Sequence, residues 1–363
     1  MRGPVRLKVA DPGFLPAVQG LRGVAASSVL AVHLYDMPKG GIYDVVNPGF
    51  LPPIWPWLQS VINVGGHGVE LFFMISGFLI PASLMRHRSV SKFLFDRALR
   101  IMPAYLILHL TLFVVGPLVG YKFFRDIGVG GYVEAFVGNL FFVPELLGLP
   151  YAQQNAWTLT YEWAFYVWFA VTFGAVARLR NPALAIPLIA LAVVCFFRWP
   201  MSAFFAIGMV FSVVDLRFRL AGWPGLLLGL VCAALMYGTL EYLHPFYGLV
   251  PGFVLFGMVL APGSAVSTAL GARVLQFLGK ISYSLYLVHP FVLFPLQVIG
   301  LRLVDHGVNR WLLWVGFIAV GVAASIVASA ASYEFVEVRL RRVLDGMLRH
   351  AIFRPIGQIE RPA

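Results

Sequence analysis

Charged residues and cysteine are both scarce in this chain. Only 12% of its 363 residues are charged, whereas 60% are hydrophobic and the mean hydropathy is +0.83. A soluble globular domain carries about 25% charged residues, so this composition excludes that class and predicts a polytopic membrane protein. Cys195 and Cys232 lie inside apolar stretches, without the spacing of a zinc site or a disulfide framework. We therefore expect buried thiols and no metal.

Long blocks of like charge and internal repeats are also missing. The net charge of +11 comes from short basic clusters between apolar runs, which is typical of cytoplasmic loops and does not indicate nucleic-acid binding. No small-residue cleavage site precedes the first apolar run, so we expect an uncleaved first span. The chain is expected to form one integral-membrane domain, residues 1–363, with a core of about 16–342 and a basic cytoplasmic tail at 339–363.

Ten segments are long and apolar enough, or nearly so, to cross about 30 Å of hydrocarbon. They are 15–35, 64–84, 101–120, 157–177, 183–197, 200–214, 222–240, 246–261, 283–300 and 311–331. Basic residues cluster at alternate connections, which predicts that both termini are cytoplasmic and that the protein lies in the inner membrane. Residues 132–149 contain Glu134, Asn139 and Pro144, which favour a re-entrant or interfacial segment. The predicted fold class is therefore all-α and polytopic.

Polar residues within the spans are costly, so they indicate a partner or a wet cavity. Arg22 and His33 are eleven residues apart, which places them within about 20° of each other on one helix and about 16 Å apart along it. The topology sorts the polar residues into two layers. The outer layer contains His33, His67, Glu70 and Glu162; the cytoplasmic half contains Arg22, Arg97, Arg100, Lys280 and His289.

The two layers suit different chemistry. In the outer layer, an imidazole beside a carboxylate can take a proton from a hydroxyl. In the cytoplasmic half, arginine guanidinium groups can form paired hydrogen bonds with the phosphate oxygens of a polyanion. Structural alternatives stay open for each group. Arg97 and Arg100 could be topology anchors, Glu162 an ion-pair partner of Arg22, and His289 a packing residue.

Five motifs in chain order resemble the acyltransferase 3 family of integral-membrane acyltransferases. They are Arg22 with His33, "GVELFFMISGFLI", "RALRIMPAY", "WTLTYEWAFY" and "LGKISYSLYLVHP", and the resemblance extends from about residue 16 to 342. It implies ten membrane helices and transfer of an acyl group, commonly acetyl, from cytoplasmic acyl-CoA to a hydroxyl of a sugar or related acceptor. The last motif departs from the family, because Tyr333 is followed by Glu337, Val338 and Arg339 where relatives often have Glu-Lys-Pro. No role for Glu337 follows from the resemblance.

The resemblance and the layers together assign the site residues. The expected catalytic residues are His33, Arg22 and Glu162; the donor-binding residues are Arg97, Arg100, Lys280 and Tyr286; the acceptor-binding residues are His67, Glu70 and His289. The expected donor is acetyl-CoA or another acyl-CoA, and its pantetheine arm would cross the depth between Arg22 and His33. The expected partners are the lipid bilayer, acyl-CoA and a carbohydrate acceptor, and a homo-oligomer stays open.

Other functional classes also fit buried charges. A transporter or flippase for a polyanionic or glycan substrate would line its path with them, although inverted repeats are not visible here. A membrane sensor or scaffold is a third class. If the protein is an acyltransferase, the open acceptors are exopolysaccharide, O-antigen, a nodulation-type lipooligosaccharide and a macrolide sugar.

Overall fold

The computed structural model describes residues 13–39, 49–87, 89–178 and 182–352. All regular structure in these ranges is helical, which confirms the all-α prediction. Some basic residues on which the predicted topology depends lie outside the described residues. They are Arg2, Arg6, Lys8, Arg88, Arg180 and the part of the tail after residue 352.

Each predicted span contains a helix. These helices are α1 (Pro16–Asp36), α3 (Gly68–His87), α4 (Val90–Leu118), α7 (Trp157–Phe173), α8 (Ala185–Arg198), α9 (Phe204–Val213), α10 (Gly222–Tyr242), α11 (Leu249–Val259), α14 (Ser282–Asp305) and α15 (Arg310–Ser332). The shorter helices are α2 (Pro56–Asn63), α5 (Val129–Leu140), α6 (Pro144–Leu147), α12 (Ala265–Leu270), α13 (Arg273–Lys280) and α16 (Arg341–Ile352). Two π-helical segments, Gly174–Arg178 and Tyr333–Leu340, follow α7 and α15.

Six helical segments have the length and hydropathy needed to cross a membrane. They are Pro16–Lys39, Pro56–His87, Val90–Leu118, Gly222–Tyr242, Ser282–Asp305 and Arg310–Arg349. Three further apolar segments are shorter: Ala185–Arg198, Pro200–Val213 and Pro245–Val259. A chain with this many apolar helices is a multi-pass membrane protein. The two cysteines are free thiols; Cys232 is buried and Cys195 is partly exposed.

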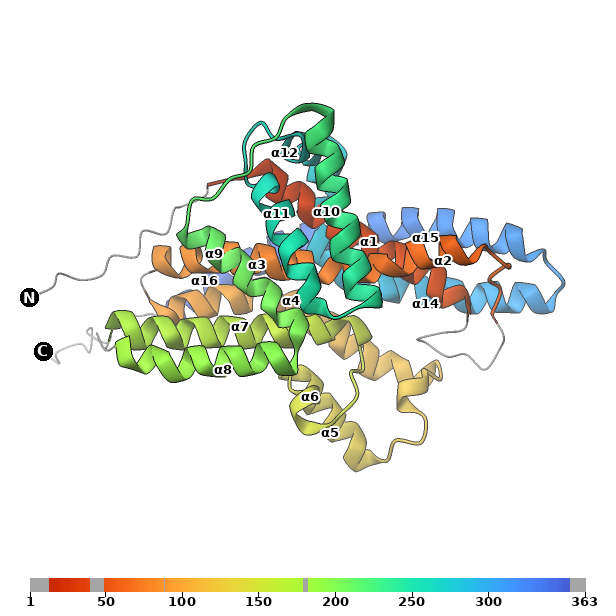
Figure 1. Ribbon diagram of the computed structural model, residues 1–363. Helices are drawn as coiled ribbons and strands as arrows, with labels where there is room; N and C mark the ends of the chain where they lie inside the picture. The colour runs from red at the N-terminus through yellow and green to blue at the C-terminus, as the bar shows by residue number, and fades with distance from the viewer. Residues whose placement is uncertain (1–12, 40–48, 88, 179–181, 353–363) are drawn as a thin grey trace, which may run out of the picture.

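The apolar stretch at residues 132–149 folds as α5 and α6 instead of one span. Helix α5 has 12 residues, so it is about 18 Å long and too short to cross the hydrocarbon. Asn139 holds the connection: its Nδ2 donates to the Ala135 carbonyl at 2.9 Å, and its Oδ1 accepts from the Ala152 N–H at 2.9 Å. Figure 1 shows α5 and α6 set apart from the main bundle. The stretch therefore forms no continuous spanning helix, and its re-entrant or interfacial position stays a prediction.

Glycines let neighbouring helices approach closely. A Cβ on Gly77 of α3 would lie 2.1 Å from the Phe205 carbonyl oxygen, and one on Gly208 of α9 would lie 2.0 Å from the Met74 carbonyl oxygen. Gly23 of α1 is similarly tight, because its Cβ would lie 2.9 Å from the Gly279 nitrogen at the end of α13. Packing of small residues is a main source of helix association in lipid. These crossings therefore position α1, α3, α9 and α13.

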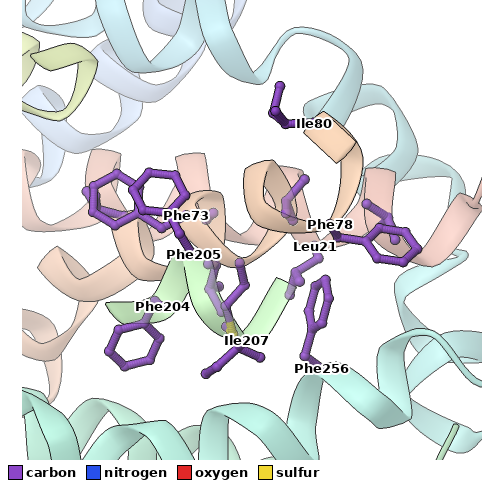
Figure 2. Close-up of a cluster of buried hydrophobic side chains, with 14 of the residues drawn as sticks. Leu21, Phe73, Phe78, Ile80, Phe204, Phe205, Ile207 and Phe256 are labelled. Atoms are coloured by element: carbon purple, nitrogen blue, oxygen red, sulfur yellow. The ribbon is translucent and has the colours of Figure 1, made fainter. Parts of the chain in front are cut away.

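An aromatic cluster fills the space between α3, α9 and α11. Phe73 stacks on Phe205 with ring centroids 4.5 Å apart, and Phe78 meets Phe256 edge to face at 5.9 Å. Figure 2 shows these rings with Leu21 of α1 in one cluster. Phe73 also lines the polar cavity described below, so the apolar core forms one of its walls.

Helices α14 and α15 run side by side, and α15 continues through the π-helical segment into α16 (Figure 1). Glu337 of this segment accepts hydrogen bonds from the Ser284 backbone N–H at 3.1 Å and the Ser284 hydroxyl at 2.6 Å. Ser284 lies in the first turn of α14, where backbone N–H groups lack helical partners and favour a negative charge. Glu337 therefore has a structural role, which the sequence had left open.

Candidate active site

Polar side chains from five helices converge on an internal cavity of about 70 Å³. The polar residues that line it are Arg22 of α1, Ser76 of α3, Arg97 and Arg100 of α4, Thr158, Glu162 and Tyr166 of α7, and Tyr283 and Tyr286 of α14. The prediction grouped several of these residues but missed Ser76, Thr158, Tyr166 and Tyr283. These four lie within the quoted motifs, and only helix packing shows that they face the same space.

Three guanidinium groups line this cavity. Arg97 donates from Nη2 to the Ser83 hydroxyl at 3.3 Å, and its Nε is buried without a hydrogen-bond partner among the described residues. Within the described residues, no carboxylate oxygen lies within 4.0 Å of a guanidinium nitrogen of Arg22, Arg97 or Arg100. These arginines are partly buried, and a charge that is withdrawn from water without a direct partner is costly. The cavity is therefore electrostatically suited to an anion.

Glu162 is the carboxylate among these arginines. Its Oε1 accepts a hydrogen bond from the Ser76 hydroxyl at 3.1 Å and another from the Tyr166 hydroxyl. An ionised carboxylate only accepts hydrogen bonds, so these two donors fix its position. The prediction that Glu162 shares a layer with His33 is wrong, because α7 places Glu162 in the arginine cavity.

His33 and His289 form a second polar cluster. Their rings meet edge to face with centroids 4.8 Å apart. The Nδ1 atom of His33 lies 2.9 Å from the Val29 carbonyl oxygen, and that of His289 lies 2.7 Å from the Leu285 carbonyl oxygen. A carbonyl oxygen only accepts, so each Nδ1 carries a proton and the Nε2 atom of a neutral ring is an acceptor. His289 Nε2 is buried and has no partner among the described residues.

The pairing of the two histidines corrects the predicted layers. The sequence placed His289 in the cytoplasmic half, but it lies at the level of His33. The expected carboxylate partner is not there, since in the described ranges no carboxylate oxygen lies within 4.0 Å of the His33 ring nitrogens. Packing of α13 explains the difference. Gly279 lies against Gly23, so α14 begins beside the second turn of α1 and reaches the level of His33 within two turns.

Tyr286 lies between the cavity and the histidines. Its side chain lines the cavity, and its ring centroid lies 6.4 Å from that of His289. Its hydroxyl donates to the Asn155 carbonyl at 2.9 Å, which holds the ring in place. The arginine cavity and the histidine pair are therefore at successive levels along α1 and α14, as the spacing of Arg22 and His33 predicted.

The predicted acceptor residues His67 and Glu70 lie in a separate cluster. His67 Nδ1 is 3.3 Å from Glu70 Oε1, and its Nε2 is 3.1 Å from Glu241 Oε2 at the end of α10. Glu70 is buried, and its Oε2 has no partner among the described residues. Neither residue lines the arginine cavity. The structure thus does not bring them together with Arg22, and their acceptor role stays a prediction.

A wider cavity of about 520 Å³ adjoins the first and shares Arg22 and Arg100 with it. Its cationic lining residues are Arg22, Arg100, Lys280, Arg341, Arg342 and Arg349, and its acidic ones are Asp96, Glu337 and Asp345. From the sequence, Lys280 and Arg100 were predicted to bind the donor, whereas the C-terminal arginines were assigned to a basic tail. Within the described residues, no group of three or more His, Cys, Asp or Glu side chains is arranged to hold a metal ion.

Comparisons with known proteins agree with the resemblance found in the sequence. The family model of the acyltransferase domain matches residues 15–330. Acyltransferase MdmB of Streptomyces mycarofaciens is 26% identical over 96% of this chain and 96% of its own length. Peptidoglycan O-acetyltransferase OatA of Listeria monocytogenes is 21% identical over 91% of this chain and 56% of its own length. Exopolysaccharide production protein ExoZ of Rhizobium meliloti is 29% identical over 66% of this chain and 80% of its own length.

No solved structure matches the chain at a significant level. The match to the family model covers most of the sequence, and the helices have the length and hydropathy of membrane spans. The chain therefore belongs to the acyltransferase 3 family and is a multi-pass membrane acyltransferase.

Proposed function

We propose that the protein transfers an acyl group, most simply acetyl, from cytoplasmic acyl-CoA to a hydroxyl of a cell-surface or secreted glycan. The observation that carries this proposal is the arrangement along α1, where Tyr286 lines a cavity with three arginines and lies next to the His33–His289 pair. Among the described residues, these three arginines form no ion pair. The names of two relatives refer to peptidoglycan O-acetylation and exopolysaccharide production, which supports a glycan acceptor.

The arginines account for the donor. Acyl-CoA carries phosphates at one end and a thioester at the other, joined by a long, thin arm. Guanidinium groups of Arg97 and Arg100 would bind phosphate oxygens with charge-assisted hydrogen bonds. Arg22 of α1 lines the same cavity as Tyr286 and would guide the arm toward it. The cavity of about 70 Å³ is narrow, so its lining side chains have to move apart when the arm enters.

The histidine accounts for the chemistry. With its Nδ1 proton donated to the Val29 carbonyl, His33 presents Nε2 as a general base. Nε2 takes the proton of the acceptor hydroxyl while the hydroxyl oxygen attacks the thioester carbonyl. A C–O bond forms, the C–S bond breaks, and the CoA thiolate leaves and takes the proton back from His33. The edge of His289 holds the His33 ring in position for both transfers.

The proposed orientation follows from the basic residues. Both termini are cytoplasmic in this arrangement, the protein lies in the inner membrane, and the acceptor approaches from the outer face. Glu162 sets the charge of the arginine cavity and acts on the donor side, since its partners are Ser76 and Tyr166 and not His33.

The proposal is tested by incubating labelled acetyl-CoA with the purified protein in lipid nanodiscs and measuring the release or transfer of the acetyl group. The wild type should transfer or slowly hydrolyse the acetyl group, whereas a transporter would leave acetyl-CoA intact. His33→Ala should lower turnover by about 10²–10⁴-fold with CoA affinity unchanged, because only proton transfer is removed. His306→Ala is the matched control, since His306 is exposed after the end of α14. Intact acetyl-CoA after incubation with the wild type and acceptor glycan would refute an acyltransferase reaction with this donor.

A further inference from the structure

The C-terminal helix α16 packs against α4 (Figure 1), and its arginines line the wider cavity. Arg349 donates from Nη2 to Asp96 Oδ1 at 2.7 Å and forms a second ion pair with Asp345 at 2.8 Å. The other Asp96 oxygen bonds His87 at the end of α3. The Arg349 guanidinium also lies 5.6 Å from the centre of the Phe95 ring. These contacts join α3, α4 and α16 at one point and fix where the α16 side chains lie.

The acidic residues of the wider cavity already have partners. Asp96 and Asp345 are ion-paired with Arg349, and Glu337 accepts both hydrogen bonds from Ser284. In contrast, Arg341 and Arg342 form no ion pair within the described part of the chain.

Lys280 makes no ion pair there either, and its ammonium lies over the Tyr333 ring at 5.1 Å. The cavity therefore has a surplus of positive charge that no carboxylate in the described part of the chain balances. Its volume of about 520 Å³ lies in the range of small-molecule sites. These features suit a ligand with several negative charges.

The wider cavity and the narrow arginine cavity are adjacent. They share the lining residues Arg22 and Arg100, so movement of these two side chains would let a ligand in the wider cavity extend into the narrow one toward Tyr286. A molecule with a bulky anionic head and a thin arm fits this shape. Acyl-CoA has this form, because its phosphates are on the nucleotide end and its thioester is at the end of the arm.

We propose that Arg341 and Arg342 of α16, together with Lys280, bind the phosphorylated nucleotide end of the acyl-CoA donor. The C-terminal helix then completes the donor site, and the Asp96–Arg349 ion pair keeps it in place. These arginines lie after residue 330, where the match to the family model ends. The inference rests on the proposed function, since it takes acyl-CoA as the donor.

Substitution of single arginines tests the proposal. Arg341→Gln and Arg342→Gln each remove one charge from the cavity lining. Arg339→Gln is the matched control, because Arg339 belongs to the same tail but pairs with Glu334 at 3.1 Å and does not line the cavity. The proteins are purified in nanodiscs of phosphatidylcholine, which supply no anionic lipid. Binding of CoA is measured directly, and kinetics are measured with acetyl-CoA and with S-acetyl-pantetheine, which has no phosphate.

A charge-assisted phosphate contact corresponds to about a tenfold change in affinity or more. Arg341→Gln should therefore raise the Kd of CoA and the KM of acetyl-CoA about tenfold, and the double variant should raise them further. The kcat at saturation and the KM of S-acetyl-pantetheine should not change, because the arm and the reacting groups are untouched. Arg339→Gln should behave as the wild type. If the double variant fails to fold, the exposed Arg342→Gln still allows the comparison.

Three other outcomes overturn the inference in distinguishable ways. Equal CoA affinity in the wild type and the variants refutes the α16 site and leaves the proposed function standing. A loss of affinity that occurs only in nanodiscs containing phosphatidylglycerol assigns the arginines to lipid headgroups. If the wild type binds no CoA and transfers no acyl group, the proposed function itself fails, and the inference fails with it.

Discussion

The crossing of α3 and α9 predicts that Gly77→Ala destabilises the protein. A Cβ on Gly77 would lie 2.1 Å from the Phe205 carbonyl oxygen, whereas ordinary contacts begin at 3.4 Å. The obstacle is backbone, so it cannot rotate away, and the helices have to separate by roughly 1.3 Å. Overpacking of a well-packed interface costs about 1–3 kcal/mol. The free energy of unfolding should fall by that amount.

The crossing of α3 and α9 has a second close contact, at Gly208 of α9. A Cβ on Gly208 would lie 2.0 Å from the Met74 carbonyl oxygen, so Gly208→Ala should cost a similar amount. Once the first alanine has forced α3 and α9 apart, the Cβ of the second alanine clashes less with the facing backbone. The double variant should therefore lose less stability than the sum of the two single variants, with a coupling of about 0.5–3 kcal/mol.

Unfolding of purified protein by denaturant measures both effects. Gly316→Ala in α15 is the control, since a Cβ there has nothing within 4 Å and alanine is the better helix former. Separation of α3 from α9 should also disturb Ser76, next to Gly77, and so reduce acetyl transfer. If Gly77→Ala is as stable as Gly316→Ala, the close approach of α3 and α9 is refuted.

Three further predictions concern charge and topology. Arg97→Ala or Arg100→Ala should each weaken CoA binding about tenfold or more, because a charge-assisted phosphate contact is lost; an unchanged Kd in both would make them topology anchors. Glu162→Gln should tighten CoA binding, because a negative charge leaves the arginine cavity, and it should lower turnover less than His33→Ala. Weaker binding would contradict that electrostatic reading. Cysteine labelling at Lys39 and at Arg341 in intact cells should show opposite accessibility, and labelling from the same side would disprove the predicted topology.

The sequence alone determined the class of the protein and the elements that build it. Long apolar segments with few charges can only be stable as helices in a bilayer, because every backbone polar group has to be satisfied within the segment. Helical periodicity also determined that Arg22 and His33 share a face, since that depends on one helix only. The motifs in chain order then indicated the acyltransferase family, which the match over residues 15–330 confirmed.

The tertiary structure decided which polar residues meet. Glu162 lies with the arginines, and His289 lies with His33, although topology had assigned each to the other layer. Periodicity within a helix cannot determine this, because the height of one helix beside another depends on contacts between residues far apart in the chain.

The close approach of Gly23 to Gly279 places α14 beside α1, and it sets which histidines touch. The same reason applies to α16. In the sequence, Arg341 and Arg342 are part of a basic tail, whereas in the fold tertiary contacts such as the ion pair between Arg349 and Asp96 bring them to the wider cavity. Local sequence thus sets the helices and their faces, whereas long-range packing of small residues and ion pairs sets the site.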